Sequence, residues 1–217
     1  MAFNEAAVIA KQVKNTIEFF DKHGLDFEIL VVDDGSTDET GDIVSSISKQ
    51  DPRVRLLQHR QNRGMGASIR DGYRASTGTF VTQLPGDMQV TADVFERFLP
   101  FLPDHDMVLS TYRRRDDGRL RRVVSLGFRS ATRLILGYWC AITGTMFIRR
   151  SLLQGLPMKS ETFMLNCEIP LRLMRLGART AFVEIEAQSR PSGSSKVLRV
   201  GRIAGVLQEM LKLRRTL

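Results

Sequence analysis

The stretch EILVVDDGSTDET, residues 28–40, constrains the fold more than any other part of the chain. Its four apolar residues, Ile29–Val32, are bounded by turn-forming residues, which is typical of a short strand buried on both faces of a parallel sheet. Asp33 and Asp34 come at the carboxyl end of that strand, where open α/β sheets bind their ligands. A glycine and two hydroxyl residues then provide a turn and a helix cap. Acids also end strands for purely structural reasons, so this stretch alone leaves both interpretations open.

Hydrophobic periodicity extends the pattern along the chain. It predicts helices over 5–23, 37–49, 66–76, 91–102, 119–137, 164–176 and 197–215, and strands over 28–33, 53–58, 79–85, 106–110, 141–148 and 179–187. Such alternation indicates an α/β fold with a mostly parallel sheet, flanking helices and right-handed crossovers. With no repeat and no low-complexity linker, we expect one domain over 1–196, followed by a basic amphipathic helix over 197–217.

Charge is concentrated in two segments of this chain, whose net charge is +8. Residues 113–133 hold eight arginines against two aspartates, and residues 190–217 hold seven Lys or Arg against one Glu. This concentration favours anionic partners, namely phosphates or an acidic lipid surface, although solvated basic helices are the alternative. Nucleic acid is disfavoured, because the basic segments lack interleaved aromatic residues.

The cellular compartment is indicated by features that the sequence lacks. The two cysteines, Cys140 and Cys167, have neither metal-ligand spacing nor a disulfide framework, which is typical of a reducing compartment. The apolar runs are shorter than the roughly 18 residues that span a bilayer, and no signal segment opens the chain. We therefore expect a cytoplasmic protein, either free or peripheral on the inner face of the cell membrane.

Five stretches follow one another in a recognisable order: FNEAAVIA (3–10), EILVVDDGSTDET (28–40), NRGMGASIRDG (62–72), LPGDMQ (84–89) and RPSGSSK (190–196). Together they resemble the family-2 glycosyltransferases of the GT-A fold, most nearly the branch typified by dolichyl-phosphate mannosyltransferase. The resemblance implies a mostly parallel sheet with a Rossmann-like nucleotide-binding half. It also implies an inverting enzyme that moves a sugar from a nucleoside-diphosphate sugar to a polyprenyl-phosphate acceptor.

The same resemblance assigns a donor site. Carboxylates accept hydrogen bonds from base imides and ribose hydroxyls, so the implied nucleotide contacts are Asn4, Glu5, Asp33 and Asp34, with Gly64 at the helix start. Asp87 and Gln89 match the family's metal motif and would hold Mg²⁺ or Mn²⁺. Two residues apart on an extended segment, they can point to the same side. An ordinary turn at Asp87 is the alternative.

The resemblance also assigns catalytic residues, namely Asp87, Arg113, Glu168, Arg190 and Lys196. The Arg and Lys residues would contact phosphates, the last two from a mobile loop, while Arg119, Arg121 and Arg122 lie on a helix that covers the phosphate side in relatives. Glu168 would be a general base or an orienting group for a hydroxyl acceptor. It could equally be a helix residue bonded to an arginine.

Three departures from the family pattern stand out. The chain opens at Met1-Ala2-Phe3-Asn4, so the family's first, central strand is missing, and the sheet would have unpaired edges unless another segment fills the slot. A start codon upstream of Met1 would explain this. Pro85 replaces a metal-binding aspartate, and Cys140 and Met146 replace an aspartate and a lysine. Two alternatives therefore remain: a related transferase with a saccharide or other hydroxyl acceptor, and a catalytically weak binding protein.

The last helix predicts attachment to a membrane surface. One face carries the apolar residues Val197, Val200, Ile203, Ala204, Leu207, Met210 and Leu211, with Lys and Arg beside or opposite it. That layout suits a helix lying in a lipid interface. Docking on the protein's own core is the alternative.

Overall fold

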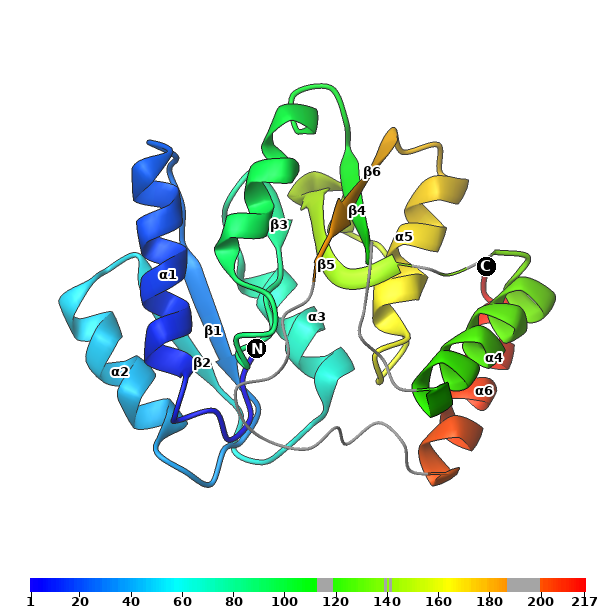
Figure 1. The fold of residues 1–217 in the computed structure, drawn as a ribbon, viewed down its shortest axis with the longest axis horizontal. Helices are drawn as coiled ribbons and strands as arrows, with labels where there is room; N and C mark the ends of the chain where they lie inside the picture. Colours follow the sequence, from blue (N-terminus) through cyan, green and yellow to red (C-terminus); the bar gives the residue numbers. More distant parts are fainter. Residues whose placement is uncertain (113–118, 139, 141, 187–199) are drawn as a thin grey trace.

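The strands form two groups in the computed structural model, which describes residues 1–112, 119–138, 140, 142–186 and 200–217 (Figure 1). Strands β1 (Ile29–Asp33) and β2 (Val54–Gln58) form a parallel pair. The other four strands form one sheet in the order β3-β5-β4-β6. Their bounds are β3 Phe80–Thr82, β4 Met107–Tyr112, β5 Ile142–Arg149 and β6 Thr180–Ile185.

The predicted α/β class, with parallel strands and flanking helices, is confirmed. Strand β5 departs from the predicted direction, because it runs antiparallel to both β3 and β4, whereas β4 and β6 are parallel. Residues 91–102 depart as well, since they form two 3₁₀ helices, Ala92–Arg97 and Leu99–Phe101, instead of one α-helix. Pro100 explains the break, because proline cannot donate a backbone hydrogen bond inside a helix.

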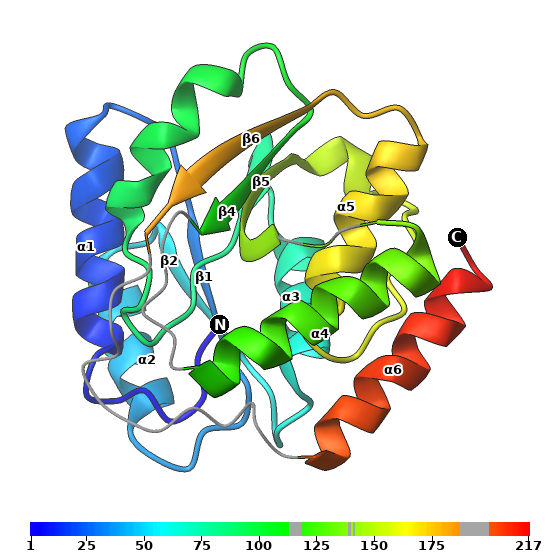
Figure 2. The same cartoon turned by 45° about the vertical axis from the view of Figure 1, so that its right-hand side comes forward.

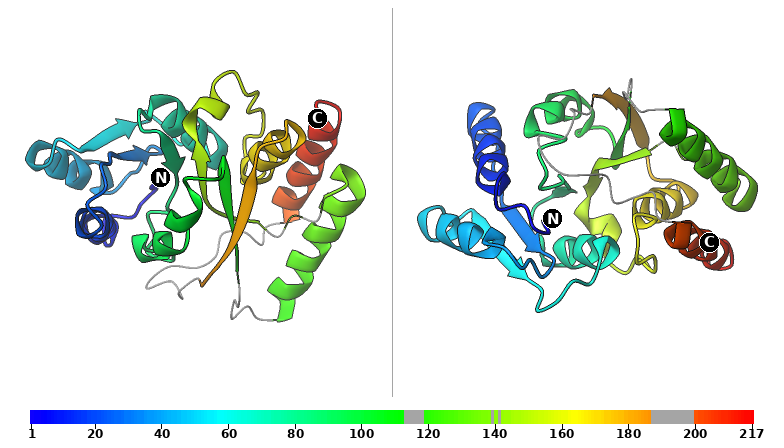
Figure 3. Two further views of the ribbon diagram at one scale, coloured as in Figure 1. Left: turned by 90° about the horizontal axis from the view of Figure 1, so that it is seen from above. Right: turned by 60° about the horizontal axis from the view of Figure 1, so that its bottom comes forward.

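Three helices cover the β1–β2 pair. Helices α1 (Ile9–Lys22) and α2 (Thr40–Gln50) pack on one face, in a cluster that includes Val13, Val31 and Val44. Helix α3 (Met65–Ala75) lies on the other face, where the close approach of Gly72 to the Val32 side chain leaves little room for a larger residue. Figure 3 shows β1 and β2 between these helices. Strand β1 is therefore covered on both faces, as its apolar run predicts, whereas β2 keeps Arg55 and Gln58 exposed.

The four-stranded sheet has two apolar layers. Alternate residues of β4 point to opposite faces, as the pleat requires. Met107 and Leu109 pack with Ile69 of α3 and Ile169 of α5 (Leu165–Arg175). Val108 packs with Phe95 of the first 3₁₀ helix, with Phe98 between the two 3₁₀ helices, and with Phe147 and Val183.

Helices α4 (Arg119–Leu136) and α6 (Val200–Arg214) lie side by side beyond α5 (Figure 2). Val206, Met210 and Leu213 of α6 are buried in a cluster with Leu136 and Leu171. The predicted membrane face is thus wrong at Met210, which faces the core. The described half of α6 docks on the protein, while Leu207 and Leu211 stay 39% and 51% exposed. The predicted boundary at residue 196 lies outside the described residues.

None of the helices in the described part of the chain is long and apolar enough to cross a bilayer.

Residues 1 and 2 take up a short extended position beside β1. Ala2 forms a single parallel bridge with Asp33. Its N–H donates to the Val32 carbonyl at 2.8 Å, and its carbonyl accepts from the Asp34 N–H at 2.9 Å. Among the described residues, this bridge is the only strand pairing on the edge of β1 opposite β2.

Candidate functional site

Two segments far apart in the sequence meet at the carboxyl ends of β1 and β3, with Met1 and Ala2 between them. Ala2 bonds the end of β1, as described above. The Met1 carbonyl accepts from the Gly86 N–H at 2.9 Å, and the Met1 amine donates to the Leu84 carbonyl at 3.3 Å. A side chain at residue 86 would lie 3.0 Å from the Met1 oxygen, so glycine permits this approach. The fold therefore brings the predicted nucleotide and metal segments together.

Asp33 is fully buried and holds the turn that follows β1. Its Oδ1 accepts from the Ser36 N–H at 3.0 Å and from the Ser36 hydroxyl at 2.5 Å. Its Oδ2 accepts from Gln58 Nε2 at 3.0 Å. Gly35 turns the chain with φ at +71°, a conformation that glycine adopts without strain. Asp33 thus fastens the turn to the end of β2.

Asp34 is also buried and anchors the loop that leads into α3. Its Oδ1 shares a 2.8 Å hydrogen bond with His59 Nδ1 and accepts from the Arg63 N–H at 2.8 Å. Its Oδ2 accepts from the Gly64 N–H at 2.8 Å. His59 is 7% exposed, and its Nε2 lies 3.2 Å from Asp71 Oδ2. The carboxylate therefore fixes the start of α3 against β1.

The direct nucleotide contacts that the resemblance implies for both acids stay a prediction. Each is occupied by three hydrogen bonds from its own chain, so in this arrangement each positions a loop. His59 and Gln58 take part in these networks and were missed by the sequence analysis. Their place at the carboxyl end of β2, beside that of β1, is the signal that could have found them.

Asn4 and Glu5 lie in the loop before α1, next to the Ser36 turn. Asn4 is exposed and has φ at +57°, in the left-handed region that asparagine tolerates. Its Oδ1 accepts from the Thr37 N–H at 2.8 Å, and its own N–H donates to the Ser36 hydroxyl at 2.9 Å. The Glu5 N–H donates to the Thr40 hydroxyl at 2.9 Å. These bonds fix a polar rim beside Asp33.

Gly64 and Gly66 let the start of α3 approach a distant segment. Gly64 precedes the helix with φ at +86°. The Gly66 N–H donates to the Glu161 carbonyl at 3.0 Å, and a Cβ at residue 66 would lie 2.4 Å from the carbonyl carbon of Glu161. Glycine at position 66 therefore serves close packing, which a side chain would prevent.

Asp87 and Gln89 lie in a turn, so the prediction of an extended segment is wrong. Asp87 Oδ1 accepts from the Gln89 N–H at 3.1 Å, and Met88 between them has φ at +59°. Across the described ranges, no group of three His, Cys, Asp or Glu residues could hold a metal ion by itself. One carboxylate and one amide oxygen nevertheless fit a Mg²⁺ or Mn²⁺ ion that takes its other ligands from phosphates and water.

Glu168 is fully buried at the start of α5. Its carboxylate accepts from the N–H groups of Lys159, at 3.1 Å, and Ser160, at 2.7 Å. Arg172 Nε donates to Oε1 at 2.9 Å, and the same guanidinium donates to the Thr216 carbonyl and hydroxyl. This geometry favours the structural alternative over a general base, because the carboxylate is already enclosed by donors of its own chain.

The remaining predicted residues fall into two groups. Arg113, Arg190 and Lys196 lie outside the described residues. Arg119, Arg121 and Arg122 lie in the first turn and a half of α4, and at these three positions the structure describes the backbone alone. Cys140 and Met146, which replace charged residues of the family, are 3% and 1% exposed.

The chain matches known proteins over most of its length. Residues 1–168 match the model of a family described as Glycosyl transferase family 2. The chain is 31% identical over 100 residues to dolichyl-phosphate beta-glucosyltransferase ALG5C of Trichomonas vaginalis, a match that covers 44% of this chain and 30% of that protein. It is 27% identical over 202 residues to the undecaprenyl-phosphate 4-deoxy-4-formamido-L-arabinose transferase of Edwardsiella ictaluri. This match covers 89% of this chain and 60% of that protein. The chain thus spans less than two thirds of the length of these relatives.

A solved structure shares the fold. Glucosyl-3-phosphoglycerate synthase from Mycobacterium tuberculosis, in complex with Mn²⁺, UDP-glucose and phosphoglyceric acid, superposes with a TM-score of 0.74 at 22% identity. The match covers 98% of this chain and 76% of that one.

Proposed function

Because the chain belongs to glycosyl transferase family 2, we propose that it transfers a sugar, with inversion, from a nucleoside-diphosphate sugar to a polyprenyl phosphate. The observation that carries the proposal is the convergence of the Asn4–Glu5, Asp33–Ser36 and Leu84–Gln89 segments at the carboxyl ends of β1 and β3. Ligands of open α/β sheets bind at that end. The names of relatives that act on dolichyl or undecaprenyl phosphate support the acceptor class.

Different residues of the chain would bind different parts of the nucleotide-sugar donor. The rim of Asn4 and Glu5 would meet the base and ribose, while Asp33 and Asp34 hold the two loops that frame them. Asp87 and Gln89 would hold a Mg²⁺ or Mn²⁺ ion, which when bound neutralises the charge that develops on the leaving diphosphate. Arg113, Arg190 and Lys196 would add counter-charge.

The transfer itself is a single displacement. An oxygen of the acceptor phosphate attacks the anomeric carbon from the face opposite the diphosphate. The new C–O bond forms as the bond to the diphosphate breaks, and the electron pair leaves with the nucleoside diphosphate. No general base is needed, because the phosphate oxygen is already ionised at neutral pH.

The enclosure of Glu168 bears on the choice of acceptor. A saccharide hydroxyl must lose a proton as it attacks, so that alternative needs a base near the acceptor. Glu168 is the candidate that the sequence offers, and it is bonded to Arg172 and to two backbone N–H groups. This arrangement supports the phosphate acceptor over the hydroxyl acceptor.

A polyprenyl phosphate lies in a membrane, and the surface of α4 and α6 suits contact with one. The exposed leucines there are Leu126, Leu134, Leu207 and Leu211, and the exposed cations include Arg133, Lys212, Arg214 and Arg215. Apolar side chains mixed with basic ones favour an interface of anionic lipids. We therefore place the membrane contact on the outer surface of these two helices.

Calorimetry tests the donor site. We expect GDP or UDP to bind more tightly with Mn²⁺ than without it, and Asp87→Ala to lose most of that gain. Pro85→Asp should strengthen the metal effect, since it restores a second carboxylate. Asp104→Ala, at an exposed acid away from the site, is the matched control. Undiminished metal-dependent binding by Asp87→Ala would contradict the metal assignment.

Radiolabelled transfer tests the acceptor. Several nucleotide-sugars are offered with polyprenyl phosphate, with free saccharides and with a small soluble phosphate. Arg190→Ala should lower lipid transfer about a hundredfold, the loss expected for about 2.7 kcal/mol of transition-state stabilisation. Transfer to saccharides or to the soluble phosphate alone would contradict the lipid acceptor, and transfer to none of them would favour a binding protein.

A further inference from the structure

The short segment 159–162 lies between helices α3, α5 and α6 and is bonded to all three. From α3, the Gly66 N–H donates to the Glu161 carbonyl at 3.0 Å, and Arg70 Nη2 donates to the Ser160 carbonyl at 2.8 Å. From α5, the buried carboxylate described above accepts from two N–H groups of the segment. The segment therefore fixes the distance between α3 and α5.

Helix α6 reaches the same segment through one acid, Glu209. Its Oε1 accepts from the Glu161 N–H at 3.0 Å, and its Oε2 accepts from the Thr162 hydroxyl at 2.6 Å. That hydroxyl in turn accepts from the Met164 N–H at 3.2 Å, just before α5 begins. Glu209 is the only acid among residues 190–217, a strongly basic stretch. Both of its oxygens are thus used to tie α6 to the rest of the fold.

The contacts continue from the segment to the carboxyl end of β1. Gly66 is bonded to Glu161, and Gly64, two residues earlier, donates its N–H to Asp34 Oδ2 at 2.8 Å. Within the first turn of α3, the Ser68 N–H donates to the Gly64 carbonyl at 3.1 Å. A continuous path therefore runs from α6 through the start of α3 to the loop at the candidate nucleotide site.

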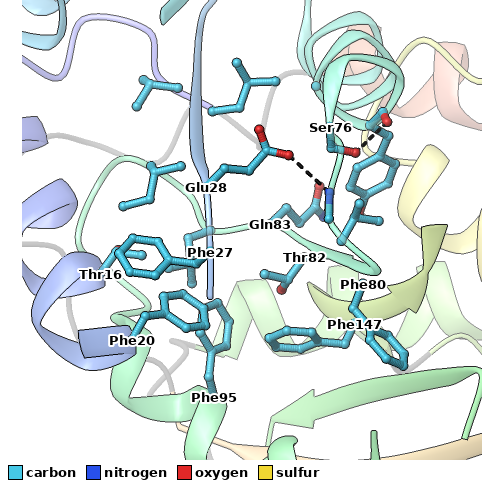
Figure 4. Close-up of a pocket in the computed structure, with 18 of the residues that line it drawn as sticks. Thr16, Phe20, Phe27, Glu28, Ser76, Phe80, Thr82, Gln83, Phe95 and Phe147 are labelled. Atoms are coloured by element: carbon cyan, nitrogen blue, oxygen red, sulfur yellow. Dashed lines mark hydrogen bonds between the residues drawn. The ribbon is translucent and has the colours of Figure 1, made fainter. Parts of the chain in front are cut away.

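Polar contacts matter for α3 because a cavity borders one side of it. The cavity has a volume of about 710 Å³ and is lined there by Ile69 and Tyr73, and Figure 4 shows Ser76, just after the helix, beside it. Beyond the helix, Glu28 Oε1 accepts from the Thr77 N–H at 2.5 Å and from the Thr77 hydroxyl at 2.7 Å. A cavity supplies no packing contacts, so on this side α3 is held mainly by the bonds at its two ends.

The link from Glu209 and the exposed leucines occupy different sides of α6. Leu207 and Glu209 are two residues apart, which is about 200° around a helix of 3.6 residues per turn. Val206 and Met210, which are buried against the protein, lie between them. Lipid can therefore contact Leu207 and Leu211 while Glu209 keeps both of its hydrogen bonds.

We propose that Glu209 is a positioning residue that couples lipid contact at α6 to nucleotide binding at the end of β1, an inference that rests on the proposed function for both ligands. Lipid contact holds α6 in place, and Glu209 then holds segment 159–162 and the start of α3. A loop that is already held loses less conformational freedom when the nucleotide binds, so its affinity rises. Because such coupling is reciprocal, bound nucleotide favours lipid contact by the same factor.

Hydrogen exchange tests the link without nucleotide or lipid, so its failure is separate from failure of the proposed function. Glu209→Ala removes the acceptor of the Glu161 N–H. We expect the amides of Gly64 and Gly66, whose own acceptors are unchanged, to exchange about tenfold faster, while amides of β4 keep their rates. Gln208→Ala, at the exposed neighbouring position of α6, is the matched control and should change neither.

Two results of this measurement would overturn the proposal. Faster exchange confined to residues 161 and 162 would mean that the bonds of Glu209 act only locally. Equal acceleration in β4 and at the start of α3 would mean a general loss of stability.

Calorimetry tests the coupling with Mn²⁺ and UDP or GDP, with and without vesicles of equal parts phosphatidylglycerol and phosphatidylcholine. We expect the vesicles to lower the Kd about fivefold for the parent and for Gln208→Ala, at the low end of the range for coupled sites. They should leave the Kd of Glu209→Ala unchanged. That variant should still float with the vesicles, since it has lost a negative charge.

The outcomes of the calorimetry are distinct. An equal effect of the vesicles on all three proteins, or no effect on the parent, would overturn the coupling. If no protein binds either nucleotide, the proposed function fails, and the exchange measurement still decides whether Glu209 holds the start of α3.

Glu209→Gln separates hydrogen bonding from charge. Its amide oxygen can accept from the Glu161 N–H, and its amide nitrogen can donate to the Thr162 hydroxyl, so both contacts are kept. We expect this variant to behave as the parent does in both measurements. If it behaves as Glu209→Ala does, the effect is one of charge, and the positioning role is overturned.

Discussion

Asp34 and His59 are joined by a 2.8 Å hydrogen bond between Oδ1 and Nδ1, and both side chains are buried. The pair ties the carboxyl end of β1 to that of β2 and, through the Gly64 N–H, to the start of α3. The same carboxylate that the resemblance assigns to nucleotide contact is therefore a fastening point of the loop.

Replacing this carboxylate tests its structural role. Asp34→Asn puts an amide where three donors converge, so at least one donor loses its acceptor. We expect the free energy of unfolding to fall by about 1–3 kcal/mol, the usual loss for an unsatisfied buried group. Urea denaturation measures it, with the exposed Asp104→Asn as control. Unchanged stability together with lost nucleotide binding would instead make Asp34 a direct ligand.

The buried pair of Glu168 and Arg172 gives a second prediction. Glu168→Ala leaves the Arg172 charge buried without its carboxylate, and we expect a loss of about 3–5 kcal/mol of stability. The double variant Glu168→Leu with Arg172→Met removes both charges and should recover much of that loss. A Glu168→Ala protein of normal stability that transfers sugar poorly would restore the general-base interpretation.

Close packing at Gly66 gives a third prediction. A methyl group there would meet the Glu161 backbone, so Gly66→Ala should destabilise the fold by about 1–3 kcal/mol. Gly127 in α4 is the matched control, because a Cβ there has no neighbour within 4 Å. Alanine at residue 127 should stabilise the helix by about 0.5–1 kcal/mol. Thermal unfolding that shifts both variants the same way would contradict this contrast.

Acid should weaken the link between Glu28 and Thr77. Partial burial alone would raise the pKa of Glu28, but hydrogen bonds from the Thr77 N–H and hydroxyl and from Arg55 outweigh it and hold the pKa below its ordinary value. Because the folded pKa lies below the unfolded one, the link stabilises above the unfolded pKa of about 4.3 and is lost as the pH falls through the folded pKa.

The comparison is between the parent and Glu28→Gln in urea from pH 3 to 7. We expect the difference in unfolding free energy to be largest above about pH 5, and about 1 kcal/mol or less because the pair is partly exposed. It should shrink toward pH 3. A difference that stays constant across this range would rule out the carboxylate as its source.

Flotation with anionic liposomes tests the surface of α4 and α6. Leu134→Ser with Leu211→Ser should lower the bound fraction several-fold at low salt, because two exposed apolar groups are lost from the interface. Leu176→Ser is the matched control, since Leu176 is 76% exposed and lies at the end of α5. Equal losses in both proteins would mean that the contact lies elsewhere.

Much of the architecture follows from local sequence. Ile29–Val32 form a strand inside the fold, because a short apolar run between turns is stabilised when a sheet removes it from water. The helices follow from the spacing of apolar residues. The order β3-β5-β4-β6 and the reversed direction of β5 do not follow, because pairing joins residues as distant as Phe80 and Arg149. The face of α6 that is buried, with Val206 and Leu213, likewise depends on what α4 and α5 present to it.

For the site, the sequence by itself determined which chemical groups are present and near which strand ends they lie, because strand and turn signals are local. Asp33 and Asp34 were located in this way, whereas Asp87 was located by its match to the family's metal motif. Only the tertiary structure decided what each group is bonded to. The donors to Asp34 come from residues 59–64, and Glu168 is bonded within a cluster that reaches Thr216. Whether a carboxylate faces a ligand or its own chain depends on hydrogen-bond donors that folding brings near it. Because those donors are distant in the sequence, the residues next to the carboxylate do not reveal them.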